Sequence, residues 1–305
     1  MRYTVVLTAG FPQIARDLLA PHFDVIEHPT EHGRSEEDMI TILADADAAI
    51  TLLSDPITRH VLEANPNLRA VSNLAVGYNN IDVDAARELG IAVTNTPGVL
   101  TEATADLTMA LMLAVMRRIV EADALLRATG RCEWDPMMLH GSSLQGKTLG
   151  ILGMGRIGTA VATRARAFGM EILGVRRGDA IDELLAASDV VSVHAPLTRD
   201  TQHIIDAKAL AKMKRGAYLI NTSRGALVDE NALCDALDSG HLRGAGLDVY
   251  DFEPEVSPRL FAMKNVVILP HIGSATEEAR NAMARIAATN VLRVLAGQEP
   301  LHRVV

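Results

Sequence analysis

Short apolar runs alternate with amphipathic segments through the first third of the chain. The runs have the length and composition of buried parallel strands, and they lie at 4–7, 23–26, 48–53, 68–72 and 91–94. Segments with helical spacing lie between them, at 14–19, 36–44, 57–63 and 83–89. This rhythm predicts a small α/β domain with a parallel, flavodoxin-like sheet, which ends at the turn-forming residues 95–98.

A long helical segment, 103–129, leads into a second alternating region. Its strands are expected at 148–152, 171–175, 190–194, 217–221, 245–249 and 266–269. The last element, 277–296, is an amphipathic helix whose apolar face carries Met283, Ile286, Ala287, Val291, Val294 and Leu295. We expect this helix to return to the first region. The chain then has two domains, 1–97 completed by 275–305 and 98–274, with a cleft between them.

The unit at 147–177 contains a strand, a glycine-rich turn, a helix and a second strand. Gly153, Gly155 and Gly158 have the GxGxxG spacing in which the first permits a tight turn, the second lets a diphosphate approach, and the third lets the helix pack closely. The helix start, at Arg156 and Ile157, presents free N–H groups to the phosphates. Its apolar face is predicted to carry Ile157, Val161, Ala165 and Phe168. Residues 98–274 are therefore predicted to form a Rossmann dinucleotide-binding domain, and the other domain is expected to bind the substrate.

The end of the second strand of this unit indicates which dinucleotide binds. An acidic residue about 20 positions on would bind the ribose 2′-hydroxyl of NAD, but Arg176 and Arg177 stand there and no carboxylate is seen at the strand end. Two guanidinium groups suit a 2′-phosphate. The sequence predicts NADP(H) as the preferred cofactor, with NAD(H) still possible. The alternative is a solvated surface pair that tolerates either cofactor.

Composition and charge narrow the class of protein. The 305 residues are 49% hydrophobic and only 3% aromatic, which suits two domains with aliphatic cores. The formal net charge of −9 argues against nucleic-acid binding, and an anionic substrate then needs a local cluster of positive groups. The two cysteines and scattered histidines indicate neither a disulfide framework nor a metal site. The apolar stretch 107–116 is too short for a membrane span and the N-terminus has no signal-peptide pattern, so a soluble cytoplasmic protein is expected.

Three polar segments follow strands of the second region, at the edge where open α/β sheets bind ligands. They are 221–225 (NTSRG), 247–254 (LDVYDFEP) and 269–274 (LPHIGS). Together with the glycine loop they resemble the D-isomer-specific 2-hydroxyacid dehydrogenases over nearly the whole chain. Two further features are most similar to the glyoxylate/hydroxypyruvate reductase branch: residues 95–107 (NTPGVLTEATADL), and Trp134 and Pro136 ahead of 144–150 (LQGKTLG).

The resemblance implies reduction of a small 2-keto acid to the D-2-hydroxy acid by hydride transfer. His271 matches the general acid of the family, and imidazole as a side-chain class titrates near neutral pH. Glu253 matches the carboxylate that orients this histidine, and Arg224 matches the residue that binds the substrate carboxylate and polarises the carbonyl. Val76 and Gly77 resemble the loop whose backbone N–H groups bind the substrate carboxylate. Taken singly, each side chain has an ordinary structural explanation; the order of all three is what indicates a site.

The resemblance also implies further cofactor contacts and a homodimer. The implied cofactor contacts are Thr104, His194, Pro196, Thr222, Ser223, Asp248 and Gly273, with Asp248 matching the residue that binds the nicotinamide carboxamide. The dimer is implied by the long helix and the following arm. Trp134, Met137 and Met138 lie in that arm, where packing at the interface is favoured over contact with a substrate. The apolar face of the long helix could equally pack within one subunit.

The chain departs from the family pattern after Arg177. Only residues 178–180 precede the next predicted helix, 181–187, where the family normally inserts a helix and a short strand. The strand at 171–175 is therefore expected near the sheet edge, with a more open adenine side. Alternative functions are a dehydrogenase for a bulkier 2-keto acid, phosphoglycerate, phosphite or formate, and a dinucleotide-sensing protein similar to corepressor relatives of the family.

Overall fold

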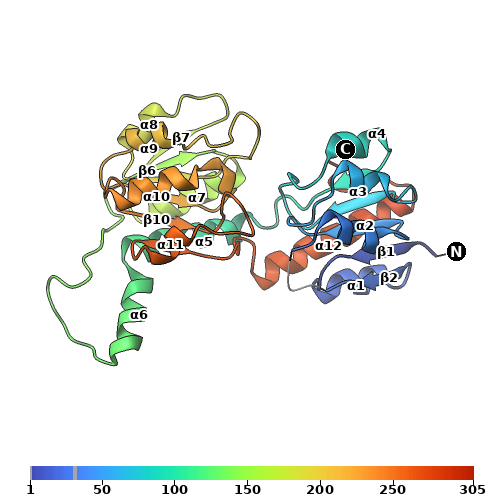
Figure 1. Cartoon of the computed structure of the whole chain (residues 1–305), viewed down its shortest axis with the longest axis horizontal. Helices are drawn as coiled ribbons and strands as arrows, with labels where there is room; N and C mark the ends of the chain where they lie inside the picture. The colour runs from blue at the N-terminus through green and yellow to red at the C-terminus, as the bar shows by residue number, and fades with distance from the viewer. Residues whose placement is uncertain (1, 30–32) are drawn as a thin grey trace. The chain divides into compact units, whose positions relative to one another are not determined.

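The chain forms two compact units. The computed structural model describes residues 2–29 and 33–305, which are shown in Figure 1. One unit comprises residues 1–100 together with 275–305, and the other comprises residues 101–274. The chain therefore passes between the units twice, and its last helix belongs to the first unit.

The first unit contains a five-stranded parallel sheet. Its strands are β1 (Thr4–Leu7), β2 (Asp24–Glu27), β3 (Ala48–Thr51), β4 (Ala70–Asn73) and β5 (Ala92–Thr94), in the order β2-β1-β3-β4-β5. This is the flavodoxin-like strand order that the pattern predicted. Each strand lies within a few residues of its predicted range, because short apolar runs locate strands better than they locate strand ends.

Helices cover both faces of this sheet. One face is covered by α2 (Glu36–Leu43), α3 (Arg59–Glu63) and α4 (Val83–Glu88), whose apolar residues join those of the strands in one core. The remaining two helices, α1 (Gln13–Leu19) and α12 (Glu277–Leu295), contact each other, and α12 also contacts β3, β4 and β5. The predicted apolar stripe of α12 is largely correct, since Met283, Ala287 and Val291 are fully buried.

The second unit contains a six-stranded parallel sheet. Its strands are β6 (Thr148–Leu152), β7 (Glu171–Val175), β8 (Val190–Val193), β9 (Tyr218–Asn221), β10 (Gly244–Leu247) and β11 (Val266–Ile268), in the order β11-β10-β9-β8-β6-β7. The strand β7 lies at the sheet edge, as the short connection after Arg177 predicted. All six strands are parallel, so their carboxyl ends lie along one edge of the sheet.

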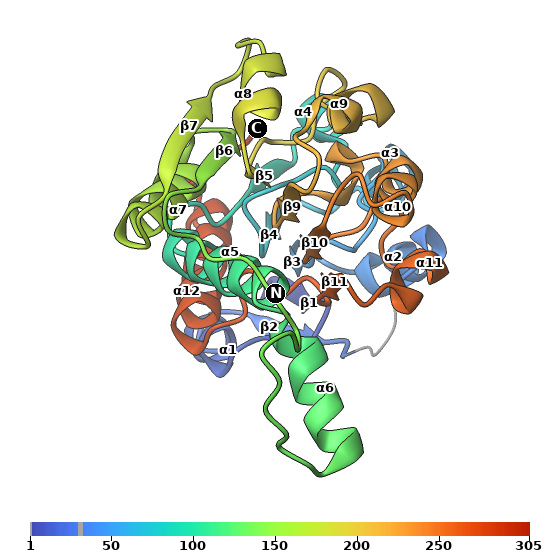
Figure 2. The same cartoon turned by 90° about the vertical axis from the view of Figure 1, so that its left-hand side faces the viewer.

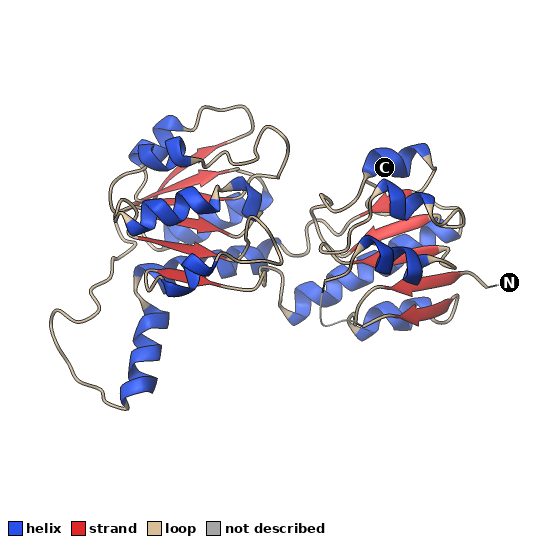
Figure 3. Cartoon of the chain, viewed as in Figure 1, coloured by secondary structure: helices blue, strands red, loops and turns tan. Residues whose placement is uncertain are grey.

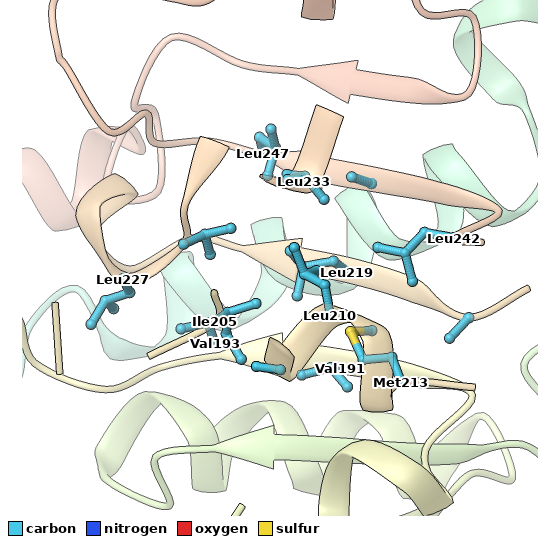
Figure 4. Packing of buried hydrophobic residues seen from close by; sticks show 14 of the residues in the cluster. Val191, Val193, Ile205, Leu210, Met213, Leu219, Leu227, Leu233, Leu242 and Leu247 are labelled. Carbon is cyan, nitrogen blue, oxygen red and sulfur yellow. The ribbon is translucent and has the colours of Figure 1, made fainter. Parts of the chain in front are cut away.

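Alternate residues of these strands build a core on each face, as the pleat requires. Leu219 of β9 packs toward α8 (Asp182–Ala187), α9 (Ala207–Lys212) and α10 (Glu230–Asp238), with α11 (Pro258–Ala262) at the margin; Figure 4 shows part of this core. Ile220 packs toward the other face, which α5 (Thr101–Met116) and α7 (Arg156–Ala167) cover. The helix–sheet–helix layering is visible in Figure 3.

The predicted single helix at 103–129 is wrong. The structure has two helices there, α5 and α6 (Ile119–Thr129), separated at Arg118, which adopts a left-handed conformation with φ 55°. Arg118 binds Glu121 of α6 through two hydrogen bonds of 2.8 and 2.9 Å, so the same residue ends one helix and stabilises the start of the next. The helical spacing continues through the break, which is why periodicity did not reveal it.

The helix α6 has no buried residue and projects from the rest of the second unit in both views (Figures 1 and 2).

A second correction concerns Phe168, which was expected on the buried face of α7. This residue ends the helix and is 44% exposed. Within residues 2–29 and 33–305, no helix has the length and apolar character needed to span a membrane.

Candidate active site

The glycine-rich turn after β6 has the geometry that each glycine predicted. Gly153 has φ 107°, and a Cβ there would lie 2.6 Å from the carbonyl carbon of His194. A Cβ on Gly158 would lie 2.2 Å from the Gly153 carbonyl oxygen, so only glycine allows this approach of α7 to the turn. Gly155 has no described atom within 4 Å of its Cβ position, which leaves space beside the backbone.

The start of α7 suits an anionic group. Gly155 is the N-cap, no side chain caps the helix, and its first turn holds no acidic residue. The positive end of the helix dipole and the first N–H groups, at Arg156 and Ile157, are therefore neither capped nor neutralised by a side chain of the N-cap or first turn. The residues present fit the diphosphate of a dinucleotide.

Arg176 and Arg177 lie beside this turn. The carbonyl oxygen of Val175, at the end of β7, accepts the N–H groups of Gly153 and Met154 at 3.1 Å each, so the next residue in the chain adjoins the glycine loop. Both arginines are exposed, and neither guanidinium group has a hydrogen bond or ion pair with any residue that the structure describes.

The expectation that no carboxylate stands at this strand end needs correction. Asp179 folds back, and its Oδ2 accepts the N–H of Arg176 at 2.7 Å. The short 178–180 connection places this carboxylate in the same tight turn as the two arginines. The sequence did not indicate this contact with Arg176, because an aspartate that follows a glycine is common in ordinary turns.

The ends of β8 and β9 are tied together. Ser223 donates from Oγ to the carbonyl oxygen of Ala195 at 2.7 Å, and Thr222 shares a 2.8 Å hydrogen bond with Thr108 of α5. His194 contacts Ser192 through Nε2 at 2.8 Å, and burial lowers the pKa of His194 to about 4. His194 is therefore neutral at physiological pH. Pro196, the next predicted contact, is exposed at the same edge.

Asp248, directly after β10, supports the segment that carries His271. Its Oδ1 accepts the N–H of Ile272 and its Oδ2 accepts the N–H of Gly273, both at 2.7 Å. Burial raises the pKa of Asp248 above its usual value, and these two N–H groups only partly offset that effect. A Cβ on Gly273 would lie 3.2 Å from Asp248 Oδ2 and 3.5 Å from the Thr104 methyl group, so these three predicted cofactor contacts lie together.

His271 and Glu253 form the central pair. His271 Nδ1 lies 2.9 Å from Glu253 Oε2, and the other carboxylate oxygen accepts the N–H of Tyr250 at 2.9 Å. Burial alone would raise the pKa of Glu253, but the contact with His271, the Tyr250 N–H and the charge of Arg224 outweigh it, so the pKa lies below its usual value. The carboxylate is thus ionised at neutral pH and holds the imidazole through Nδ1.

Two features fix the direction of the imidazole. His271 has φ 54°, a left-handed conformation that costs a non-glycine residue about 1–3 kcal/mol. The hydrogen bonds from the next two N–H groups to Asp248 hold this conformation. With Nδ1 engaged by Glu253, the Nε2 atom is the one left for a substrate.

Arg224, after β9, is the third member of the group. Burial lowers the pKa of its guanidinium group, and the negative charge of Glu253 acts in the opposite direction. Nη1 donates to the carbonyl oxygen of Ser223 at 2.7 Å, while its other N–H groups bind no residue described in the structure. A half-buried cation with free donors, close enough to Glu253 for their charges to interact, suits a carboxylate or a polarised carbonyl.

Sequence reasoning missed the residues that hold the loop carrying Glu253. The buried Glu230 accepts the N–H of Asp251 at 3.2 Å and that of Ser257 at 3.0 Å, one at each end of the loop. Asp251 also contacts His203 Nε2 at 2.8 Å. No motif marks these residues, because their role depends on which backbone groups the loop brings to them.

Val76 and Gly77, the predicted carboxylate-binding residues, lie in the first unit on the loop after β4. In the arm after α6, Trp134 is 86% exposed and Met137 is 73% exposed, so neither is buried within its own subunit.

Among the residues described, no group of three or more His, Cys, Asp or Glu side chains has an arrangement that holds a metal ion.

Comparison with known proteins agrees with this arrangement. Residues 109–273 match the family model described as D-isomer specific 2-hydroxyacid dehydrogenase, NAD binding domain. The chain is 44% identical over 321 aligned residues to a glyoxylate reductase from Thermococcus litoralis, covering all of this chain and 97% of that protein.

Solved structures show the same similarity. A protein from Thermus thermophilus superposes with a TM-score of 0.94 at 45% identity, covering 99% of this chain and 100% of that one. An NADPH-dependent glyoxylate/hydroxypyruvate reductase from Sinorhizobium meliloti, solved with NADP and malonate, has a TM-score of 0.85 at 31% identity, covering 100% of this chain and 97% of that one.

Proposed function

The chain belongs to the D-isomer-specific 2-hydroxyacid dehydrogenase family and is an NAD(P)-dependent oxidoreductase of the glyoxylate reductase branch; we propose that it reduces glyoxylate or hydroxypyruvate with NADPH. The observation that carries the proposal is the group formed by His271, Glu253 and Arg224. A proton donor, its orienting carboxylate and a half-buried cation with free donors are what reduction of a 2-keto acid requires.

In the proposed reaction, the cofactor and each site residue have separate roles. The cofactor, when bound, supplies the hydride for the carbonyl carbon. Arg224 polarises the carbonyl and binds the substrate carboxylate, which Val76 and Gly77 also bind through their N–H groups. His271 gives its Nε2 proton to the carbonyl oxygen as the negative charge develops there. Glu253 holds the ring through Nδ1, which keeps Nε2 directed toward the substrate.

The preference for NADPH rests on the turn after β7. Two exposed guanidinium groups without protein partners adjoin the glycine loop, where a 2′-phosphate would lie. The relative from Sinorhizobium meliloti is named NADPH-dependent and was solved with NADP. Asp179 adds a negative charge to the same turn, which the two guanidinium groups outnumber.

We also propose a homodimer formed through α6 and the arm. Four large apolar side chains of α6 are 42–53% exposed: Ile119, Val120, Leu125 and Leu126. A groove beside them is lined by Val115, Met263 and Val267, among others. An apolar helix face of this kind, with no cover from its own subunit, is typical of an interface between subunits.

The proposed function is tested by following NADPH oxidation with glyoxylate, hydroxypyruvate, pyruvate and a bulkier 2-keto acid. Turnover with the first two, at kcat/KM well above that for the bulkier acid, is expected. Phosphite and formate are tested in the opposite direction with NADP⁺. A protein that binds NADPH tightly but turns over none of these substrates would contradict the proposal and would favour a dinucleotide sensor.

A further inference from the structure

In the loop after β4, three consecutive carbonyl groups accept hydrogen bonds from Asn73, Asn95 and Thr96. The Ala75 oxygen accepts the backbone N–H of Thr96 at 2.9 Å and its hydroxyl at 3.2 Å. The Val76 oxygen accepts Nδ2 of Asn95 at 2.8 Å, and the Gly77 oxygen accepts Nδ2 of Asn73 at 2.9 Å. Three consecutive peptide groups are therefore held through their carbonyl oxygens.

Fixing a carbonyl also fixes the N–H that follows it. In a planar trans peptide, the carbonyl of one residue and the N–H of the next point in opposite directions. The hydrogen bonds to Ala75, Val76 and Gly77 thus direct the N–H groups of Val76, Gly77 and Tyr78 away from the donor that holds each preceding carbonyl. In the part of the chain that the structure describes, none of these three N–H groups has an acceptor.

The two amide side chains are themselves immobilised. Asn73 is fully buried, and its Oδ1 accepts the Thr51 hydroxyl at 3.1 Å. The backbone N–H of Asn95 donates to His302 at 3.3 Å, and its carbonyl accepts Nδ2 of the fully buried Asn290 of α12 at 3.4 Å. Both donors are thus part of the rigid first unit rather than loose surface groups.

We propose that Asn95 and Asn73 are positioning residues for the substrate carboxylate. They act through the loop, by keeping three N–H groups directed outward as a main-chain anion site. This inference rests on the proposed function, because it assigns the anion to the 2-keto acid. It adds the reason why a loop without a cation of its own binds an anion: its donors are held in place before the substrate arrives, so little ordering remains to be done on binding.

The test compares Asn95→Ala and Asn73→Ser with the wild type. Asn95→Ala frees the Val76 carbonyl, and Asn73→Ser frees the Gly77 carbonyl while also removing contacts with Thr51 and Asn80. In each variant the next N–H no longer has a fixed direction. The KM for glyoxylate is expected to rise roughly tenfold in each, since hydrogen bonds to a charged group are worth about 1.5–3 kcal/mol. The value of kcat should stay within about twofold, because carboxylate binding contributes equally to the ground and transition states.

Three further readouts separate positioning from general damage. The Kd for NADPH should not change, since the glycine loop belongs to the other unit. The inhibition constant for oxalate should rise in parallel with KM. Asn265→Ala is the matched control, because Asn265 also donates Nδ2 to a backbone carbonyl, that of Arg243 at 3.2 Å, in the second unit; its KM should equal that of the wild type.

Combining the two substitutions adds an internal check. Because both act on one loop, the double variant should raise KM less than the product of the single effects. An unchanged KM in a folded Asn95→Ala, in an enzyme that reduces glyoxylate, would overturn this inference and leave the proposed function intact. If Asn73→Ser does not fold, Asn95→Ala decides, because the Asn95 side chain lies nearer the surface. A wild type that reduces no 2-keto acid would overturn the proposed function and this inference with it.

Discussion

Asp248 and Glu253, the two carboxylates near His271, each accept backbone N–H groups from a neighbouring segment and so hold that segment in place. Asp248 binds the residues after His271, and Glu253 binds Tyr250 while its second oxygen faces the imidazole. The direction of the imidazole is therefore set by short contacts within the second unit. The contact between His271 and Glu253 could be expected because the family motifs contain both residues. The positions of Glu230 and Asn95 could not, since a lone carboxylate or amide has no distinctive pattern.

His194 makes stability depend on pH. Its folded pKa of about 4 lies below the usual value of 6.5, so between these values the unfolded chain binds a proton that the folded chain does not. Stability is therefore expected to fall as pH falls through this window, by about 1–2 kcal/mol between pH 7 and pH 5 from this residue. Urea unfolding of the wild type and of His194→Gln, both without cofactor, at pH 7 and pH 5 measures this loss of stability. The variant should lose less stability on acidification, and equal losses would contradict the account.

Arg176 and Arg177 are expected to discriminate between cofactors. Replacing both with alanine should raise the KM for NADPH roughly tenfold or more, because charge-assisted hydrogen bonds to the 2′-phosphate are lost, and should change the KM for NADH by less than about twofold. Arg215→Ala, which removes an exposed arginine at the opposite end of the sheet, is the control. An equal loss for both cofactors would show that the pair does not bind the phosphate.

At the scale of elements, the parallel strands were predicted well and the helix between the two regions was not. Apolar runs identify strands such as β8 and β9 because both faces of these sheets are covered. The break at Arg118 depends on one backbone conformation and one ion pair, and neither interrupts the helical spacing. Strand ends, turns and the folding back of Asp179 depend likewise on tertiary contacts.

The loop at 250–257 is expected to depend on the side chain of Glu230. Glu230→Leu leaves the N–H groups of Asp251 and Ser257 without their acceptor, which should reduce the free energy of unfolding by about 2–4 kcal/mol. Because Glu253 lies in this loop, kcat should fall as well, while the Kd for NADPH changes little. Glu230→Gln keeps one acceptor oxygen, so its free energy of unfolding and its kcat should lie between those of the wild type and Glu230→Leu. Denaturant unfolding and steady-state kinetics measure these effects, and unchanged kcat in Glu230→Leu would show that the loop does not depend on Glu230.

For the whole molecule, a net charge of −9 means that the proposed anionic substrate needs local hydrogen-bond donors and positive groups at its site. The order of motifs along the chain was enough to indicate two α/β domains and the reaction. It was not enough to establish how subunits associate, because the same apolar spacing suits an interface and an internal core.

The proposed dimer is tested by Leu126→Glu in α6, which places a charge on the exposed apolar face. Sedimentation velocity is expected to show a dimer for the wild type and a monomer for the variant, because an unpaired charge at an apolar interface is costly to bury. Ile26→Glu, on the exposed side of β2, serves as the control and should remain dimeric. A wild type that sediments as a monomer would contradict the assignment of α6 as an interface.

The most direct test of the central claim is the turnover of glyoxylate with NADPH by His271→Ala. We expect kcat to fall by about 10²–10⁴, the usual contribution of a general acid, while NADPH binds with an affinity within about twofold of wild type. A variant that binds the cofactor normally and retains the wild-type kcat would contradict the assignment of His271 as the proton donor.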